Sequence, residues 1–268
     1  MFECPSPVIE AVQSRTQEIV DALHSLSDGD LSAPSGLQDW SRLTIAAHLR
    51  YGARAMLRMT EGALTAQPVA FYPEGRERQR ADTLRPDASE RPHDVVLSLA
   101  RCSKELHAAW RSVGPERWSV QVTEPDDNPD LGTVSLARLP LMRLTEVEVH
   151  GGDLNLDLSP WSEVFVSAAL PFRLSWLNTR RTNHREVDDS LEGSWLLVAT
   201  DGPTFRVAVR GRRVESHPAD STAAATAVIE ASSRDLLALL LGRPLVAGAR
   251  LRGDVAFGEA FSRAFPGP

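Results

Sequence analysis

The sequence lacks the features that mark several large classes of protein. Its 268 residues include two cysteines, Cys4 and Cys102, which give neither a disulfide framework nor a Cys-x-x-Cys metal signature. No apolar run approaches the roughly 20 residues of a membrane-spanning helix, and the N-terminus lacks the basic and apolar regions of a signal peptide. We therefore expect a cytoplasmic protein with no membrane partner, in which any thiol needed for chemistry comes from outside the chain.

A surplus of basic charge is also missing. The formal net charge is −7 and the isoelectric point is near 5.5, which argues against binding to nucleic acid or to an anionic membrane, because either needs a concentrated basic surface. With 42% hydrophobic and 24% charged residues, the composition is that of a globular protein. The length suffices for one large domain or two ordinary ones.

Helical periodicity dominates the first half of the chain. Apolar residues recur at three- and four-residue intervals in three segments, namely residues 8–26, 42–61 and 93–113. The polar run that begins at Ser27 predicts the end of the first helix, and Ser41 is the expected N-cap of the second. Cys102 falls on the apolar stripe of the third helix, which indicates a structural role. Two short segments, 118–123 and 132–136, predict a β-hairpin before a fourth helix.

The fourth helix carries a carboxylate and an imidazole with metal-ligand spacing. It begins at Pro140, and the glycine pair after His150 predicts its end. Glu146 and His150 lie four residues apart and so share one face. Such a pair offers one oxygen and one nitrogen to a divalent metal, but a catalytic zinc usually takes a third protein ligand. The alternative is an ordinary surface pair, with His150 as a favourable cation at a helix C-terminus.

A further candidate ligand lies on the second helix. His48 occupies its second turn, beside small and mixed side chains that leave room for a ligand. A lone histidine in such a position is more often a hydrogen-bonded core residue. With candidates on the second and fourth helices, however, the four helices predict a bundle whose interior or mouth holds a metal.

The connector over residues 65–92 is rich in Pro, Gly and Arg and shows no sustained period, so we expect a long loop. Its arginines are Arg76, Arg78, Arg80 and Arg85. They either solvate a mobile connector or form a clamp for a carboxylate, since a guanidinium group pairs bidentately with such anions.

The pattern changes after residue 158, where we place a domain boundary, giving domains of residues 1–158 and 159–268. A helix over 162–181 is expected to bend or divide at Pro171. Two strands over 194–200 and 204–209 follow, joined by a turn, and a third over 223–231. Ser233 is then the expected cap of a last helix over 234–241. The second domain is therefore an α+β module.

Four separated segments resemble the mycothiol-dependent maleylpyruvate isomerase family. They are Asp39-Trp40-Ser41 through Ala47-His48-Leu49, Tyr72-Pro73 followed by arginines, Arg143 through His150 with Asp153-Leu154, and Leu239-Leu240-Leu241-Gly242-Arg243. The resemblance covers nearly the whole chain. It implies an α+β fold in which a DinB-like four-helix bundle precedes a smaller domain similar to sterol carrier proteins.

The resemblance also assigns roles to individual residues. It implies that His48, Glu146 and His150 bind a divalent metal, zinc being the usual ion, with a fourth position open for water or a thiol. It implies that Arg243 and an arginine of the Tyr-Pro loop, best matched by Arg78, bind the carboxylates of the substrate. The alternative for Arg243 is a cation at a helix C-terminus.

Three functions remain open at this stage. The first is a zinc- and mycothiol-dependent isomerase, in which a thiolate acts on a small electrophilic carboxylate. The second is a thiol S-transferase that uses the same site, and the two differ in whether the thiol leaves again. The third is a binding protein that holds an apolar ligand in its second domain, with a purely structural metal. A closed four-ligand metal shell would favour the third, and an open one the enzymes.

Overall fold

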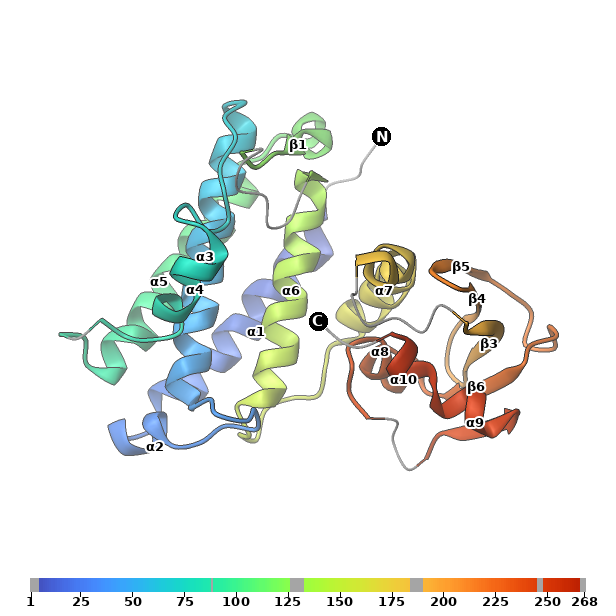
Figure 1. The fold of residues 1–268 in the computed structure, drawn as a ribbon. Helices are drawn as coiled ribbons and strands as arrows, with labels where there is room; N and C mark the ends of the chain where they lie inside the picture. The colour runs from blue at the N-terminus through green and yellow to red at the C-terminus, as the bar shows by residue number, and fades with distance from the viewer. Residues whose placement is uncertain (1–4, 88, 126–132, 184–189, 245–247, 266–268) are drawn as a thin grey trace. The chain divides into compact units, whose positions relative to one another are not determined.

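The computed structural model describes residues 5–87, 89–125, 133–183, 190–244 and 248–265, with side chains up to residue 178 in the third range. Two compact units make up the chain, Met1–Phe165 and Val166–Pro268 (Figure 1). The predicted boundary near residue 158 lies in the connection between α6 (Leu139–Asp153) and α7 (Glu163–Asn183). The first unit is helical and the second contains a mixed sheet, so the predicted α+β class is confirmed.

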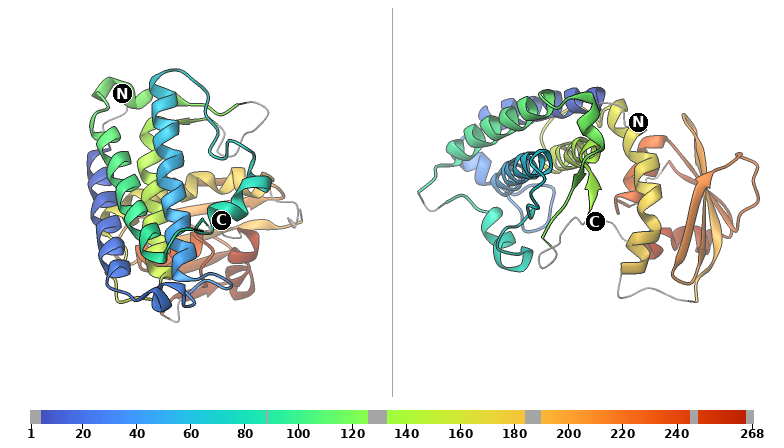
Figure 2. Two further views of the ribbon diagram at one scale, coloured as in Figure 1. Left: turned by 90° about the vertical axis from the view of Figure 1, so that its left-hand side faces the viewer. Right: turned by 90° about the horizontal axis from the view of Figure 1, so that it is seen from above.

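Four long helices form the first unit, as the sequence predicted: α1 (Ser6–His24), α3 (Arg42–Leu64), α5 (Pro92–Arg111) and α6. Helix α1 packs against α5 and α6, and α3 packs against the same two helices. The right-hand view of Figure 2 looks along this bundle, with α3 and α6 side by side. The apolar stripes meet inside it, where Ile19, Ile45, Leu99 and Leu144 are fully buried.

Ser41 fixes the start of α3, and therefore the position of His48. Its hydroxyl oxygen accepts a hydrogen bond from the Thr44 amide at 3.0 Å, and its backbone pairs with Pro34 in an isolated bridge. A serine cap of this kind contributes about 1 kcal/mol to helix stability. The predicted cap is confirmed, and the helix continues three residues past the expected Glu61 to Leu64.

Several short elements escaped the sequence analysis. The run after Ser27 is the start of α2 (Asp28–Ser32), because the Ser27 hydroxyl caps the Asp30 amide at 3.1 Å. The 65–92 connector contains α4 (Arg76–Thr83), whose almost wholly polar sequence gives no apolar stripe to detect. The predicted hairpin is present as β1 (Gln121–Val122) and β2 (Val134–Ser135), between the short helices η1 (Pro115–Ser119) and η2 (Leu136–Arg138). Its turn lies outside the described residues.

The glycine pair does not end α6, which contradicts the sequence-based prediction. The helix continues through Gly151 and Gly152 to Asp153. A Cβ atom on Gly151 would lie 2.8 Å from both Nε and Nη2 of Arg15. The glycine is therefore present because a side chain of α1 packs against the helix backbone, and not as a helix terminator.

Arg15 and Glu148 form a buried ion pair between α1 and α6. The Arg15 Nε atom lies 3.3 Å from Glu148 Oε2, and the two side chains are 5% and 1% exposed. Glu148 also accepts hydrogen bonds from the amide and hydroxyl groups of Ser162, and Arg15 Nη1 donates to the Ser159 carbonyl at 2.9 Å. These bonds fasten the segment after α6 to the bundle.

The second unit is built on a five-stranded sheet in the order β5-β4-β3-β6-β7. Its strands are β3 (Glu192–Ala199), β4 (Thr204–Arg210), β5 (Arg213–Pro218), β6 (Ala227–Ala231) and β7 (Arg250–Gly253). The β3–β6 pair is parallel and the other pairs are antiparallel. The three predicted strands correspond to β3, β4 and β6, whereas β5 and β7 are additional strands that expose most of their residues.

Helices α7 and α8 lie on one side of this sheet (Figure 1). Helix α7 is continuous through Pro171, so the predicted division there is absent. None of the helices in the described ranges, α7 included, combines the length and the apolar character that crossing a bilayer requires.

The end of the second unit packs around a tryptophan. Helix α8 (Ser233–Leu240) is capped by the Ser232 hydroxyl and not by that of Ser233, which corrects the sequence-based prediction by one residue. The short helices α9 (Val255–Glu259) and α10 (Phe261–Ala264) follow β7. The Trp195 ring stacks on Phe257 with centroids 4.2 Å apart, and its Nε1 atom donates to the Phe257 carbonyl.

The two neighbouring glycines of α6 allow a matched stability test. Gly151→Ala should lower the free energy of unfolding by about 1–3 kcal/mol, because its methyl group would displace the buried Arg15 guanidinium. Gly152→Ala should raise it by about 0.5–1 kcal/mol, since the nearest atom to the added carbon is 3.9 Å away and alanine favours a helix. Urea unfolding followed by circular dichroism measures both values, and effects of the same sign would contradict this account of α6.

Candidate metal centre

Three side chains with metal-binding chemistry meet between α3 and α6. His48 comes from α3, and Glu146 and His150 come from successive turns of α6. One ligand atom from each lies within 4.8 Å of the others. His48 Nε2 is 2.8 Å from Glu146 Oε2, and His150 Nε2 is 3.6 Å from the same oxygen. The structure thus brings together the three residues that the family resemblance implied.

Trp40 forms one wall of this group. Its ring stacks on His150 with centroids 6.0 Å apart and an interplanar angle of 17°, and meets His48 edge-on at 5.5 Å. The two histidine rings are themselves perpendicular, with centroids 4.9 Å apart. The side chains of His48, Glu146 and His150 are 18%, 37% and 17% exposed, so each of the three is partly accessible to solvent.

Asp153 sets the orientation of His150. Its Oδ2 atom lies 3.1 Å from His150 Nδ1, which leaves Nε2 directed toward Glu146. A carboxylate on the far nitrogen fixes the tautomer and ring orientation of a metal-binding histidine. Asp153 is part of one of the motifs that carry the family resemblance, but no role was predicted for it. Its position three residues after His150 could have indicated the contact between the two side chains. Trp40 was missed in the same way.

Nearby charges hold the group in protonation states that suit a metal. Burial would raise the pKa of Glu146, but the hydrogen bond from His48 and the nearby basic groups, among them Arg143, outweigh it and lower the pKa to about 2. Burial is the largest cause that lowers the pKa of His48, and the hydrogen bond and charge of Glu146 oppose this shift without cancelling it. At neutral pH Glu146 is therefore ionised and His48 is neutral, which are the forms that bind a cation.

The donor set fits a divalent metal with an open coordination position. Two imidazole nitrogens and one carboxylate oxygen are typical ligands of catalytic zinc, which keeps three protein ligands. In the described part of the chain, the group contains these three residues and no fourth His, Cys, Asp or Glu. Asp153 contacts Nδ1 of His150, whereas Nε2 of the same ring faces Glu146. Asp153 therefore orients a candidate ligand and does not belong to the group itself.

The loop that carries the predicted substrate arginines is anchored beside His48. Tyr51, one turn further along α3, stacks on Tyr72 with centroids 5.3 Å apart, and its hydroxyl donates to the Phe71 carbonyl at 2.8 Å. The Arg76 guanidinium lies over the Tyr72 ring at 5.8 Å. The connector predicted to be a long loop is therefore packed against the face of α3 that carries the candidate ligand.

The two predicted substrate arginines have different surroundings. The Arg78 side chain on α4 is 80% exposed, and its Nε atom lies 3.7 Å from Glu74 Oε2. Arg243 is half-buried and follows Gly242, whose φ of 77° turns the chain at the end of α8. The Arg243 amide closes this turn by donating to the Ala238 carbonyl at 2.9 Å. The roles of both residues toward a substrate stay predictions.

Metal analysis tests the group directly. We expect one divalent metal per chain, and a strong loss of zinc affinity in His48→Ala, Glu146→Ala and His150→Ala with the bundle still folded, because the helices have apolar stripes of their own. His93→Ala is the matched control, since that histidine pairs with Asp28 at 2.6 Å outside the group. Full zinc occupancy in His48→Ala would exclude this ligand set.

Two solved structures share the fold over almost the whole chain. One is the crystal structure of the mycothiol-dependent maleylpyruvate isomerase, which is 19% identical, with a TM-score of 0.66 over 94% of this chain and 95% of that chain. The other is a histidine-to-alanine mutant of that isomerase, 18% identical, with a TM-score of 0.65 over the same shares of the two chains. At these identities the likeness shows the fold alone. No curated protein sequence gives a significant match.

The match to a family model assigns the chain to a family, which the likeness to the two solved structures does not. Residues 12–155 match the mycothiol maleylpyruvate isomerase N-terminal domain. The match covers more than half of the chain and includes α3, α5, α6 and most of α1, together with His48, Glu146 and His150. The chain therefore belongs to the mycothiol maleylpyruvate isomerase family.

Proposed function

We propose that this protein is a zinc- and thiol-dependent enzyme that isomerises a small unsaturated carboxylate of the maleylpyruvate type. The observation that carries the proposal is the group of His48, Glu146 and His150, in which three protein donors leave room for a further ligand. Zinc held there would lower the pKa of a thiol and keep it as a thiolate at neutral pH, where a free thiol with a pKa of about 8.5 is mostly protonated. Mycothiol, or a similar small thiol, supplies a nucleophile whose reversible addition to an activated cis double bond permits rotation.

The chain's own residues prepare the site for this chemistry. Glu146, with its pKa lowered to about 2, offers a permanent negative charge. Asp153 holds the His150 ring in place, so little rotamer freedom is lost on binding. The Trp40 ring packs against both histidine rings and so shields this side of the group from water. Arginines of the Tyr-Pro loop and Arg243 are proposed to bind the two carboxylates of the substrate.

Three donors favour an enzyme over a binding protein with a structural metal. Structural zinc sites are usually closed by four protein ligands, whereas the group in the described part of the chain has three. A thiol transferase would use the same residues, and the two enzymes differ in whether the thiol remains on the product. Product analysis distinguishes them, because isomerisation returns the thiol unchanged and transfer consumes one thiol per product.

Dependence on an added thiol is the first test of the proposed activity. The zinc-loaded protein should convert maleylpyruvate to its trans isomer with mycothiol present, and thorough removal of small thiols should abolish turnover. The double variant Cys4→Ser, Cys102→Ala should keep this activity, since Cys102 is buried in α5 within 3.2 Å of Arg54 Nε and Cys4 lies outside the described residues. Full turnover of the thiol-free native protein would overturn the proposal.

The role proposed for Arg243 is tested by Arg243→Lys. Lysine keeps the charge but loses the planar fork that binds a carboxylate bidentately, so kcat/KM should fall by roughly tenfold or more, the loss of a charge-assisted hydrogen bond. Arg250→Lys is the control, because that arginine is exposed and 3.8 Å from Glu230. Equal kcat/KM values in Arg243→Lys and the native enzyme would leave Arg243 as a helix-end cation.

A further inference from the structure

Arg143 is buried inside the bundle without a hydrogen-bonding partner. It lies on α6, one turn before Glu146, and none of its surface is exposed. Among the residues that the structure describes, none forms a hydrogen bond with its Nε, Nη1 or Nη2 atom. Burial lowers its pKa to about 10, so it is still charged at neutral pH. A buried guanidinium with five unused N–H donors is costly and calls for an acceptor.

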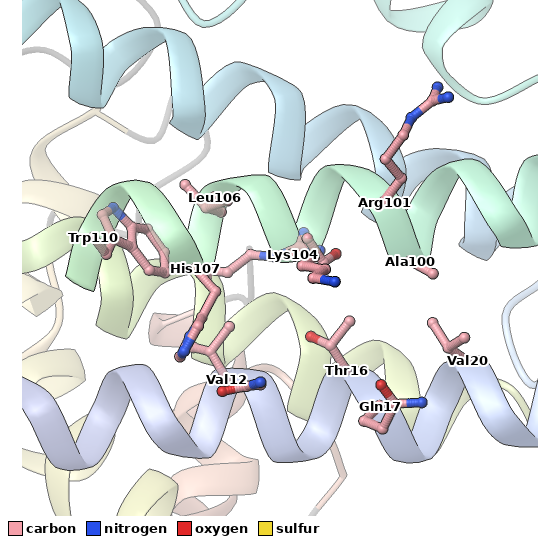
Figure 3. Close-up of a pocket in the computed structure, with 13 residues that line it drawn as sticks. Val12, Thr16, Gln17, Val20, Ala100, Arg101, Lys104, Leu106, His107 and Trp110 are labelled. Atoms are coloured by element: carbon pink, nitrogen blue, oxygen red, sulfur yellow. The ribbon is translucent and has the colours of Figure 1, made fainter. Parts of the chain in front are cut away.

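A groove between α1 and α5 reaches this side chain. Its volume is about 450 Å³, and Figure 3 shows side chains of the two helices facing each other across it. Its lining includes Thr16, Ser103, Lys104, His107, Trp110 and Arg143. None of the described residues that line the groove carries a carboxylate. The Arg101 head group points away from α1 in Figure 3. The charged side chains that remain in the lining are Lys104 and Arg143, and burial lowers the pKa of His107, which is neutral at neutral pH.

Other polar atoms of the groove also lack partners. Thr16 Oγ1, Ser103 Oγ and His107 Nδ1 are buried and make no hydrogen bond. Each is a donor or can become one, which is the inventory that binds an anion. The carboxylate of Glu10 acts on the pKa of His107, but it already pairs with Arg111 at 3.2 Å. The groove therefore offers positive charge and donors, and none of the described residues that line it supplies a carboxylate to pair with them.

Apolar side chains form part of the lining of the groove. Val12, Leu106 and Trp110 are buried beside it, and Val20 and Ala100 are half-buried. We propose that this groove is a binding site for a small organic carboxylate with an apolar body, whose carboxylate pairs with Arg143 and Lys104. Arg143 suits this role because a guanidinium binds a carboxylate through two parallel hydrogen bonds.

This site shares no lining residue with the candidate metal centre, although the charge of Arg143 lowers the pKa of Glu146 and of His48. The metal ligands come from α3 and α6, whereas the groove is formed by α1 and α5 and receives Arg143 alone from α6. On its other side Arg143 lies against α3, where a Cβ on Gly52 would be 3.0 Å from Nη1. The inference does not depend on the proposed isomerase activity, and it holds for a protein with any bound metal.

Titration calorimetry with sodium benzoate tests the proposal on the full-length, zinc-loaded protein. Benzoate should bind once per chain with a dissociation constant of roughly millimolar or tighter. The neutral isostere benzamide should bind at least about tenfold more weakly, because it cannot form a charge-assisted pair. Benzoate affinity should stay within about twofold after zinc is removed with a chelator, since the site has no metal.

Two variants locate the benzoate. Arg143→Met should abolish binding while leaving the fold intact, since an apolar side chain of similar length replaces an unpaired buried charge. Lys104→Gln should weaken binding by about twofold to fivefold, the range expected for an exposed ion pair. Arg213→Gln removes one exposed charge from the second unit and should leave the affinity unchanged. If Arg143→Met does not fold, Lys104→Gln, the benzamide comparison and the labelling experiment still decide.

Amine labelling gives an independent location, because Lys104 is the single lysine in the sequence. Benzoate should slow acylation of Lys104 in proportion to the fraction of protein occupied, with the N-terminal amine as internal reference in the same peptide digest. Equal affinities for benzamide and benzoate, loss of binding on zinc removal, unchanged affinity in folded Arg143→Met, or labelling of Lys104 at an unchanged rate would each overturn the proposal.

Discussion

The charged side chains of α6 need partners inside a packed bundle, and the first unit is arranged around this constraint. This helix carries Arg143, Glu146, Glu148, His150 and Asp153 within three turns of a packed bundle. Charges in such an interior need partners, because their desolvation is not recovered by burial alone. Helix α1 supplies Arg15 to Glu148, helix α3 supplies His48 to Glu146, and Asp153 serves His150 from the same helix. Side chains of α6 thus take part in both the candidate metal site and the ion pair with α1.

Local periodicity explains most of what the sequence predicted. The four long helices, the Ser41 cap and the strands β3, β4 and β6 follow from apolar spacing and from residues that act on their immediate neighbours. The pairing of Glu146 with His150 is also local, since it needs one turn of helix. His48 was different, because spacing alone favours a core histidine at that position, and only the order of several motifs along the chain suggested that it meets the other two.

The features that the sequence concealed depend on distant contacts. Gly151 resembles a terminator until Arg15, far away in the sequence, is seen lying against it. Helix α4 has no apolar stripe, and its loop is held by Tyr72 stacking on Tyr51. A linear pattern likewise cannot show that Arg143 makes no hydrogen bond with the described part of the chain, since this depends on how neighbouring helices pack. In each case the information lies in which surfaces meet.

The order in which the bundle closes follows from where His48 and Glu146 stand in the chain. They are 98 residues apart, and α5 is inserted between their helices. Closing so long a loop costs chain entropy that no local contact repays, so the three donors come together only when the fourth helix docks. Binding of a metal by these three donors would then belong to the last stage of folding. A metal-sensitive spectroscopic signal would consequently time the arrival of α6, while far-UV circular dichroism would record the earlier formation of the helices themselves.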